Sequence, residues 1–295
     1  FRTPSSLFYL NSLFFLPYVK YYMFMLPSVL ILGFTNIILI ERIFKNIELN
    51  KINYITFLCL LIFIFINIFF YRIAEHGTDK SAQILAFLLI VETLIFLNSK
   101  KDLNLILSKI YILIGLIISL KAFYVLYGVF ILILFLKLLQ NQKFINTIFI
   151  FTKNNYFIPL IILFLLVLIS YFFNTSCFIY PLSSTCVEQV LWSINKAEVI
   201  ELNNWYEQWA KGGAGPDYRV DNPEQYISYF NWVNNWIDKY FFNKVSDFLF
   251  GLIFLLLVTN IFFITSKKKE IIFPKIKILL FVLFLLFFEW FYNHP

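Results

Sequence analysis

Long runs of apolar residues are the feature that most constrains how this chain can fold. A bilayer with a hydrocarbon core of about 30 Å takes roughly 20 residues of helix to cross. Eight runs of about that length occur, at residues 21–40, 54–70, 82–97, 103–120, 122–139, 157–173, 247–265 and 276–291. Backbone groups in lipid have to bond within their own segment, so the runs predict transmembrane helices.

Composition supports the same class of protein. Hydrophobic residues make up 61% of the chain and charged residues 14%, whereas about a quarter of a soluble domain is charged. A disordered chain, a coiled coil and an ordinary soluble enzyme are therefore excluded. We expect an all-α membrane protein with about eight transmembrane helices and a small helical subdomain on its outer face. The expected parts are a bundle over 1–173, an outer loop over 174–246 and two last spans over 247–295.

The two ends of the chain suggest a piece cut from a longer protein. The first residue is Phe1, and the basic segment and cleavage site of a signal peptide do not follow it. The chain stops at Pro295, directly after an apolar run. We therefore expect that residues needed for function lie outside it.

The apolar stretch around Lys121 allows two arrangements. One long helix over 110–136 would bury this lysine midway, which costs about 2.5–3.5 kcal/mol. A helical hairpin that turns at Lys121 instead lets the ammonium reach water, and we favour it.

The distribution of basic residues supports the hairpin. With it, the loops on one side carry most of the lysines, including those at 45, 51, 100, 101, 137, 143, 153, 267, 268 and 269. The short segments on the other side carry few, namely Arg2, Lys20, Arg72, Lys80 and Lys121; the long loop over 174–246 is not counted, because long loops follow the rule poorly. The positive-inside rule makes the lysine-rich side cytoplasmic, so residues 174–246 are expected on the outer, periplasmic face. The excess of lysines on the cytoplasmic side accounts for the net charge of +7. We therefore expect a lipid bilayer as partner and no nucleic acid.

Two cysteines begin the long outer loop. Cys177 and Cys186 are nine positions apart, and an oxidising outer compartment favours a disulfide between them. A metal pair is the alternative, but no CxxC motif and no nearby histidine supports it. Cys59 lies inside an apolar run and is expected to be a small apolar core residue.

Five of the six tryptophans also lie in this loop. Trp205 and Trp209 form one pair at i, i+4 spacing, and Trp232 and Trp236 form another, so each pair shares a helical face. We expect amphipathic helices over 204–210 and 223–242. The tryptophans form an aromatic belt at the lipid headgroups, a sugar-stacking platform, or part of a groove for a lipid carrier. Asp217 and Arg219, in the glycine-rich turn between these helices, are candidate substrate contacts.

The densest polar segment beside an apolar run covers residues 72–80. Its Glu75, His76 and Asp79 can supply a general base or hold a divalent cation. Its Arg72 and Lys80 can bind an anionic phosphate. The alternative is a solvated turn. Inside the next run, Glu92 is expected to face the bundle or a wet cavity, or to pair with a neighbouring side chain.

Three segments resemble a family of uncharacterised bacterial polytopic inner-membrane proteins. They are residues 71–85 (YRIAEHGTDKSAQIL), 176–186 (SCFIYPLSSTC) and 290–295 (WFYNHP). These proteins resemble membrane-embedded glycosyltransferases of the GT-C type, which use a sugar carried on a polyprenyl phosphate. The resemblance implies a base in the first outer loop, which would precede Phe1, and it implies that residues 75–79 face the active site. It does not assign a catalytic residue.

The sequence leaves three classes of function open. A transferase that moves a sugar from a polyprenyl-phosphate donor to an envelope acceptor is the leading hypothesis. A lipid-linked-sugar transporter would show inverted repeats and broken helices, and no repeat is visible. A membrane assembly protein without catalysis remains the third.

Overall fold

The described part of the chain is helical. The structure is a computed structural model that describes residues 5–48, 54–70, 73, 78–99, 102–140, 142–212, 222–264 and 276–293. Within these residues no β-strand forms, and the only extended pairing is an isolated bridge between Cys177 and Cys186. The expected all-α class is thus confirmed.

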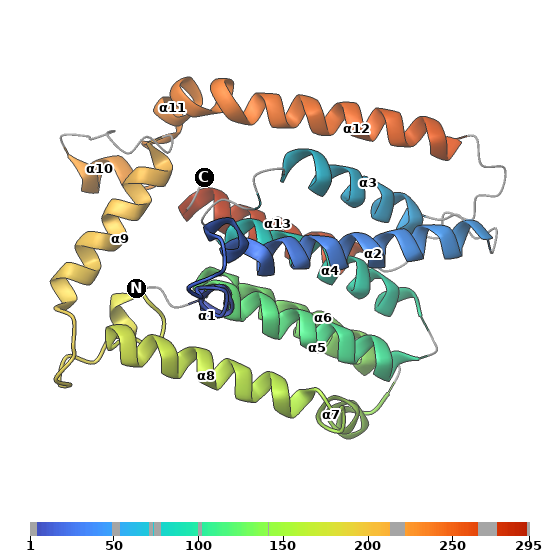
Figure 1. Ribbon diagram of the computed structural model, residues 1–295, viewed down its shortest axis with the longest axis horizontal. Helices are drawn as coiled ribbons and strands as arrows, with labels where there is room; N and C mark the ends of the chain where they lie inside the picture. The colour runs from blue at the N-terminus through green and yellow to red at the C-terminus, as the bar shows by residue number, and fades with distance from the viewer. Residues whose placement is uncertain are drawn as a thin grey trace. The chain divides into compact units, whose positions relative to one another are not determined.

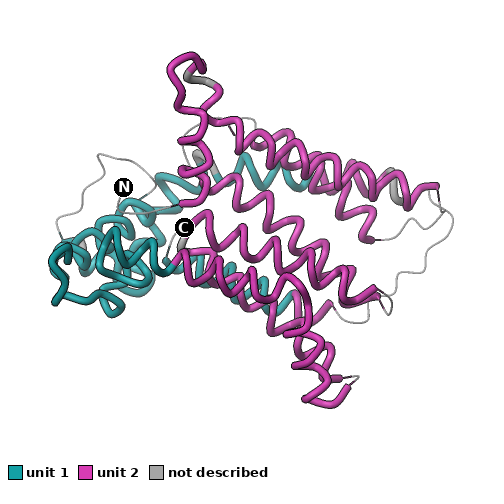
Figure 2. The backbone as a smooth tube through the Cα atoms, turned by 60° about the horizontal axis from the view of Figure 1, so that its bottom comes forward, with its two compact units in different colours: residues 1–2, 168–254, 280–295 teal, residues 3–167, 255–279 magenta. Residues whose placement is uncertain are grey.

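The chain divides into two compact units, which Figure 2 shows in different colours. Unit 2 comprises residues 3–167 and 255–279, and unit 1 comprises 1–2, 168–254 and 280–295. The helices of unit 2 up to residue 152 are α1 (Ser6–Ser12), η1 (Tyr21–Met25), α2 (Leu26–Glu48), α3 (Tyr54–Phe69), α4 (Asp79–Asn98), α5 (Leu103–Leu120), η2 (Ala122–Gly128), α6 (Val129–Leu139) and α7 (Phe144–Thr152). Unit 1 contains η3 (Ser183–Thr185), α9 (Lys196–Lys211), α10 (Pro223–Ile227), α11 (Val233–Trp236) and the π-helical η4 (Ile237–Val245). Three longer helices run through both units, namely α8 (Phe157–Thr175), α12 (Ser246–Ile264) and α13 (Ile276–Asn293) (Figure 1).

Five described helices are long and apolar enough to cross a membrane. They cover Met23–Glu48, Asp79–Asn98, Leu103–Leu120, Phe157–Thr175 and Ile276–Asn293. A sixth span is possible only if Val233–Phe242 and Ser246–Ile261, bent by 61°, count as one. The shorter apolar helices Tyr54–Phe69 and Phe123–Leu139 fall below 18 residues, so the eight spans expected from the sequence are not confirmed. The described residues are compatible with a multi-pass membrane protein.

The structure confirms the hairpin at Lys121. Helix α5 ends at Leu120, and Lys121 is extended with φ −157° and ψ 138° before η2 and α6 continue the chain. Near the far end of α6, the Lys137 ammonium donates to the carbonyl oxygens of Leu97 at 2.5 Å and Ser99 at 3.2 Å. These carbonyls lie where α4 ends, just before α5 begins, so α6 returns to the starting end of α5.

Helix α4 lies at the centre of unit 2. It packs against α2, α3, α5 and α6. Of its most apolar 18-residue stretch, 72% is buried inside the protein. The core that it shares with α2 and α3 contains Leu39, Cys59, Ile62, Ile66, Phe70, Ile73, Ile84, Leu88 and Val91. Because α4 has protein on so many sides, a charged residue in its middle needs a partner inside the protein.

A buried ion pair joins α2 to α4. Arg42 Nη2 donates to Glu92 Oε1, and the Glu92 side chain is only 6% exposed. Asn46 near the end of α2 donates to Thr56, and Asn98 at the end of α4 donates to Tyr54. Because both partners lie in the first turn of α3, α2 and α4 meet α3 at the same end and run in the same direction. Because Glu92 pairs with a neighbouring side chain, the sequence-based alternative of a paired carboxylate is confirmed.

The Arg42–Glu92 pair generates a prediction about stability. In Arg42→Met, the buried Glu92 carboxylate loses its counter-charge, so we expect the free energy of unfolding to fall by about 3–5 kcal/mol. The measurement is denaturant unfolding of the full chain in detergent, followed by circular dichroism. The double variant Arg42→Met/Glu92→Leu removes both charges and is expected to recover most of the loss. A single variant as stable as the wild type would contradict this role.

Candidate functional site

An ion pair marks one end of unit 2. Asp79 is the first residue of α4, and Lys121 directly follows the last residue of α5. Lys121 Nζ lies 2.5 Å from Asp79 Oδ1, and the two side chains are 46% and 53% exposed. The carboxylate at a helix N-terminus is favoured by the helix dipole. The ends of two helices therefore fix the positions of both charged residues, while about half of each side chain remains exposed and accessible to a ligand.

Hydroxyl groups surround the same ends of the helices. Ser6 Oγ in α1 and Ser119 Oγ in the last turn of α5 are 2.8 Å apart. Ser28 at the start of α2 and Ser81 in the first turn of α4 are buried, and within the described residues their hydroxyls have no hydrogen-bond partner. The starts of α2 and α4 and the end of α5 thus contribute polar groups to one end of the bundle.

The structure describes only part of the sequence-predicted polar segment. Asp79 and the half-buried Lys80 lie in the first turn of α4, whereas Arg72, Glu75 and His76 lie outside the described residues. The Asp79–Lys121 contact joins this segment to the hairpin turn, which the sequence analysis did not connect. Among the residues that the structure describes, no three His, Cys, Asp or Glu side chains lie close enough together to hold a metal ion.

Helix α9 carries the predicted aromatic pair in unit 1. It begins with an Asn195 cap, whose side chain accepts from the Ala197 backbone N–H at 2.9 Å. Trp205 is 50% exposed and Trp209 is 38% exposed, so both indoles are accessible from one side of the helix. The other two predicted substrate contacts, Asp217 and Arg219, lie outside the described residues.

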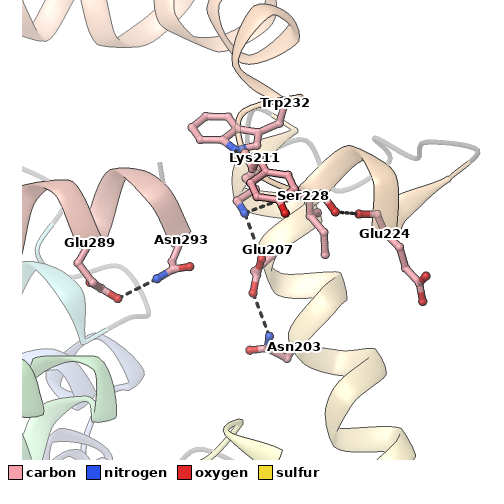
Figure 3. Close-up of polar contacts among 10 residues, drawn as sticks. Asn203, Glu207, Lys211, Glu224, Ser228, Trp232, Glu289 and Asn293 are labelled. Atoms are coloured by element: carbon pink, nitrogen blue, oxygen red, sulfur yellow. Dashed lines mark hydrogen bonds and ion pairs between the residues drawn. The ribbon is translucent and has the colours of Figure 1, made fainter.

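The C-terminal turn of α9 holds a buried lysine that the sequence analysis did not single out. Lys211 is 1% exposed, and its ammonium lies 3.1 Å from Glu207 Oε2 and donates to the Ile227 carbonyl oxygen at 2.9 Å (Figure 3). The ammonium also lies 5.8 Å from the ring centre of Trp232 and 5.2 Å from that of Tyr292. Glu207 accepts a further bond from Asn203 at 3.0 Å. This lysine therefore links α9, the end of α10, the residue before α11 and the end of α13.

The helix expected over 223–242 is interrupted. Helix α10 ends at Ile227, Ser228 is extended and Tyr229 has a φ of 50°. A left-handed tyrosine cannot continue an α-helix, so α11 and η4 start anew beyond it. The i, i+4 spacing of Trp232 and Trp236 survives this break, and their rings meet edge to face at 6.0 Å.

The two loop cysteines are joined. Cys177 and Cys186 form a disulfide, and Val187 N–H donates to the Ser176 carbonyl oxygen at 2.9 Å beside it. Trp192 Nε1 donates to the Phe172 carbonyl oxygen at 3.2 Å. The chain beyond α8 is therefore tied back to the last turns of that helix.

The buried lysine gives a stability prediction for unit 1. In Lys211→Ala, the Glu207 carboxylate loses its counter-charge and the ring cluster loses its central contact, so we expect a loss of about 2–4 kcal/mol. Lys196→Ala, at an exposed position of the same helix, should change stability by less than about 0.5 kcal/mol. Tryptophan fluorescence during denaturant unfolding reports the difference. Equal stability of the two variants would show that Lys211 contributes nothing.

Comparison with known proteins finds no similar curated protein and no similar solved structure. One family model, described as "Domain of unknown function (DUF8201)", matches residues 3–295. Since the match extends over nearly the whole chain, the chain belongs to the DUF8201 family.

Proposed function

We propose that this chain is a bacterial inner-membrane glycosyltransferase of the GT-C type, which transfers a sugar from a polyprenyl-phosphate donor to an envelope acceptor. The Asp79–Lys121 pair is the observation that carries the proposal. It provides a fixed cation and a carboxylate at one end of an apolar bundle, which suits a substrate with a lipid tail and a charged headgroup. Residues 71–85 resemble a family of uncharacterised membrane proteins that in turn resemble membrane glycosyltransferases, which is in line with the same substrate class.

Lys121 is proposed to bind the donor phosphate together with Lys80 and Arg72. An ion pair as exposed as Asp79–Lys121 contributes only about 0–1 kcal/mol. A phosphate group can therefore take over the ammonium of Lys121 at little cost. The apolar helix surfaces beside Lys121 can bind the polyprenyl chain of the same donor.

The proposed reaction is a displacement at the anomeric carbon. The acceptor hydroxyl oxygen forms a bond to that carbon while the bond from the carbon to the phosphate oxygen breaks. Polyprenyl phosphate leaves with the electron pair, and a carboxylate takes the proton of the acceptor hydroxyl. The carboxylates of Glu75 and Asp79 are candidates for this proton transfer, with the His76 imidazole as an alternative base, and a divalent cation is a candidate partner of the two carboxylates.

The acceptor is proposed to stack on α9. Exposed indole rings bind the apolar faces of sugar rings, and Trp205 and Trp209 offer two rings about one helical turn apart. Asp217 and Arg219, in the segment that follows α9, are proposed to add polar contacts to sugar hydroxyls. An acceptor glycan needs both kinds of contact.

The loop over residues 174–246 is proposed to lie on the periplasmic face. The Cys177–Cys186 disulfide supports this side, because disulfides persist in oxidising compartments. The lysines around α7 support the opposite side for the segment between α6 and α8.

Cysteine labelling tests this orientation. We expect Glu198→Cys in α9 to react with an impermeant maleimide in intact spheroplasts, and Gln142→Cys, between α6 and α7, to react only after the membrane is opened. Both positions are exposed; Cys59 is buried, and the other two cysteines are joined. The reverse pattern would invert the topology.

A transfer assay tests the reaction. Full-length protein in proteoliposomes is given a panel of labelled polyprenyl-phosphate sugars and an envelope acceptor extract. We expect Lys121→Gln to raise the donor KM at least about tenfold, because a charge-assisted bond to phosphate contributes about 1.5–3 kcal/mol. Asp79→Asn should also slow transfer. Glu48→Gln is the matched control, because Glu48 lies at the end of α2 far from the Asp79–Lys121 pair, and it should leave transfer unchanged.

Two results would contradict the proposed reaction. One is an absence of transfer with every donor from protein that unfolds cooperatively, which would favour the assembly or transport hypotheses. The other is transfer that Lys121→Gln leaves unaffected, which would separate the reaction from this end of the bundle.

A further inference from the structure

Helix α7 is too short to cross a bilayer and has one strongly apolar exposed face. At about 1.5 Å per residue, its nine residues extend about 13 Å. Ile145 is 78% exposed, Ile148 40% and Phe149 58%. Their i, i+3, i+4 spacing places these three side chains on one face. Exposing such an apolar face to water is energetically unfavourable.

The opposite face of α7 is fixed to unit 2. Thr147 and Phe151 are buried, and the Phe151 ring lies 5.6 Å from that of Phe135 in α6 and 6.1 Å from that of Tyr111 in α5. In Figure 1, α7 is seen nearly end-on while α5 and α6 run across the view. The axis of α7 therefore crosses those of its neighbours in the same unit.

A polar cluster places α7 at the end of the bundle. Asn154, two residues after α7, donates to Asn104 Oδ1 at 2.6 Å and to Ser108 Oγ at 3.0 Å. These partners lie in the first turns of α5. Helix α7 therefore lies level with the start of α5, where a spanning helix meets the headgroup region.

Both ends of α7 carry a positively charged lysine. Lys143 precedes the helix and Lys153 ends it, and both are exposed. Lys153 Nζ lies 5.0 Å from the Phe149 ring centre, so its apolar stem follows the apolar face while its ammonium remains at the rim. No Asp or Glu occurs between Asp102 and Glu188.

We propose that α7 is an interfacial helix that inserts Ile145, Ile148 and Phe149 among the acyl chains and binds anionic lipid headgroups through Lys143 and Lys153. An apolar face bordered by lysines, parallel to the membrane plane, is the pattern of helices that bind anionic lipid surfaces. The partner is the lipid monolayer at the end of unit 2 opposite the Asp79–Lys121 pair. The proposal requires that unit 2 spans a membrane, but it does not require glycosyl transfer.

Fluorophore quenching in vesicles measures the depth of α7. The full chain carries Ile145→Cys labelled with a small fluorophore, in vesicles of phosphatidylcholine and phosphatidylglycerol. We expect stronger quenching by lipids brominated near the headgroup than by lipids brominated deep in the chain. A label at Leu132→Cys, on the exposed side of α6, should show the reverse order. A label at Glu198→Cys should be quenched by aqueous iodide.

Brominated phosphatidylglycerol measures the anionic contacts on the same Ile145 label. Each lysine near an anionic surface contributes about 1 kcal/mol, or about fivefold in binding. We therefore expect the wild type to be quenched more strongly by brominated phosphatidylglycerol than by brominated phosphatidylcholine. In Lys143→Gln/Lys153→Gln this preference should fall about fivefold for each lysine removed, until the two lipids quench equally. Lys196→Gln, in α9, is the matched control and should leave the preference unchanged.

Three outcomes would overturn the proposal. An Ile145 label quenched by iodide like the Glu198 label would place α7 in water. A label screened from both iodide and brominated lipid would show that protein, such as a second copy of the chain, covers the face. A Leu132 label quenched by iodide would overturn the membrane-spanning arrangement of unit 2 and the proposal with it.

Discussion

Charged side chains in an apolar bundle need partners inside the protein, and the arrangement of unit 2 follows from this constraint. A buried charge without a partner costs several kcal/mol, so Glu92 in the central helix requires a cation from a neighbour. Arg42 supplies it and holds α2 beside α4. The amides of Asn36 and Asn67 exchange two hydrogen bonds, at 3.0 Å and 2.9 Å, and join α2 to α3 in the same way.

Two lysines then determine the length of the hairpin that follows α4. Lys121 ends α5 and reaches Asp79 at the start of α4. Lys137 reaches the carbonyl oxygens at the end of α4, which are unsatisfied acceptors at the negative end of the helix dipole. The hairpin of α5 and α6 is thus attached to both ends of α4. Lys137 remains buried because these carbonyls replace water as its partners.

The sequence predicts the helices of this protein better than the contacts between them. Apolar runs and the cost of a central lysine are local properties, so the hairpin at Lys121 follows from them. The partner of Glu92 is 50 positions away and depends on how α2 packs, which a pattern along the chain does not contain. The same holds for Lys211, whose partners come from three other segments. The long helix over 223–242 fails because helical spacing says nothing about the left-handed Tyr229 between its two halves.

Three ion pairs among the described residues, Arg42–Glu92, Asp79–Lys121 and Glu207–Lys211, differ in exposure, and this difference separates scaffold from candidate site. Arg42–Glu92 and Glu207–Lys211 each contain a side chain at 6% exposure or less, so breaking either pair would leave a buried charge. Asp79–Lys121 has both partners about half exposed, and its separation leaves each charge solvated. Of these three pairs, Asp79–Lys121 is the one that can exchange its internal contact for a ligand at little cost. This difference is why the proposed substrate site lies at the end of unit 2 where α4 begins, while the two more buried pairs are suited to structural roles.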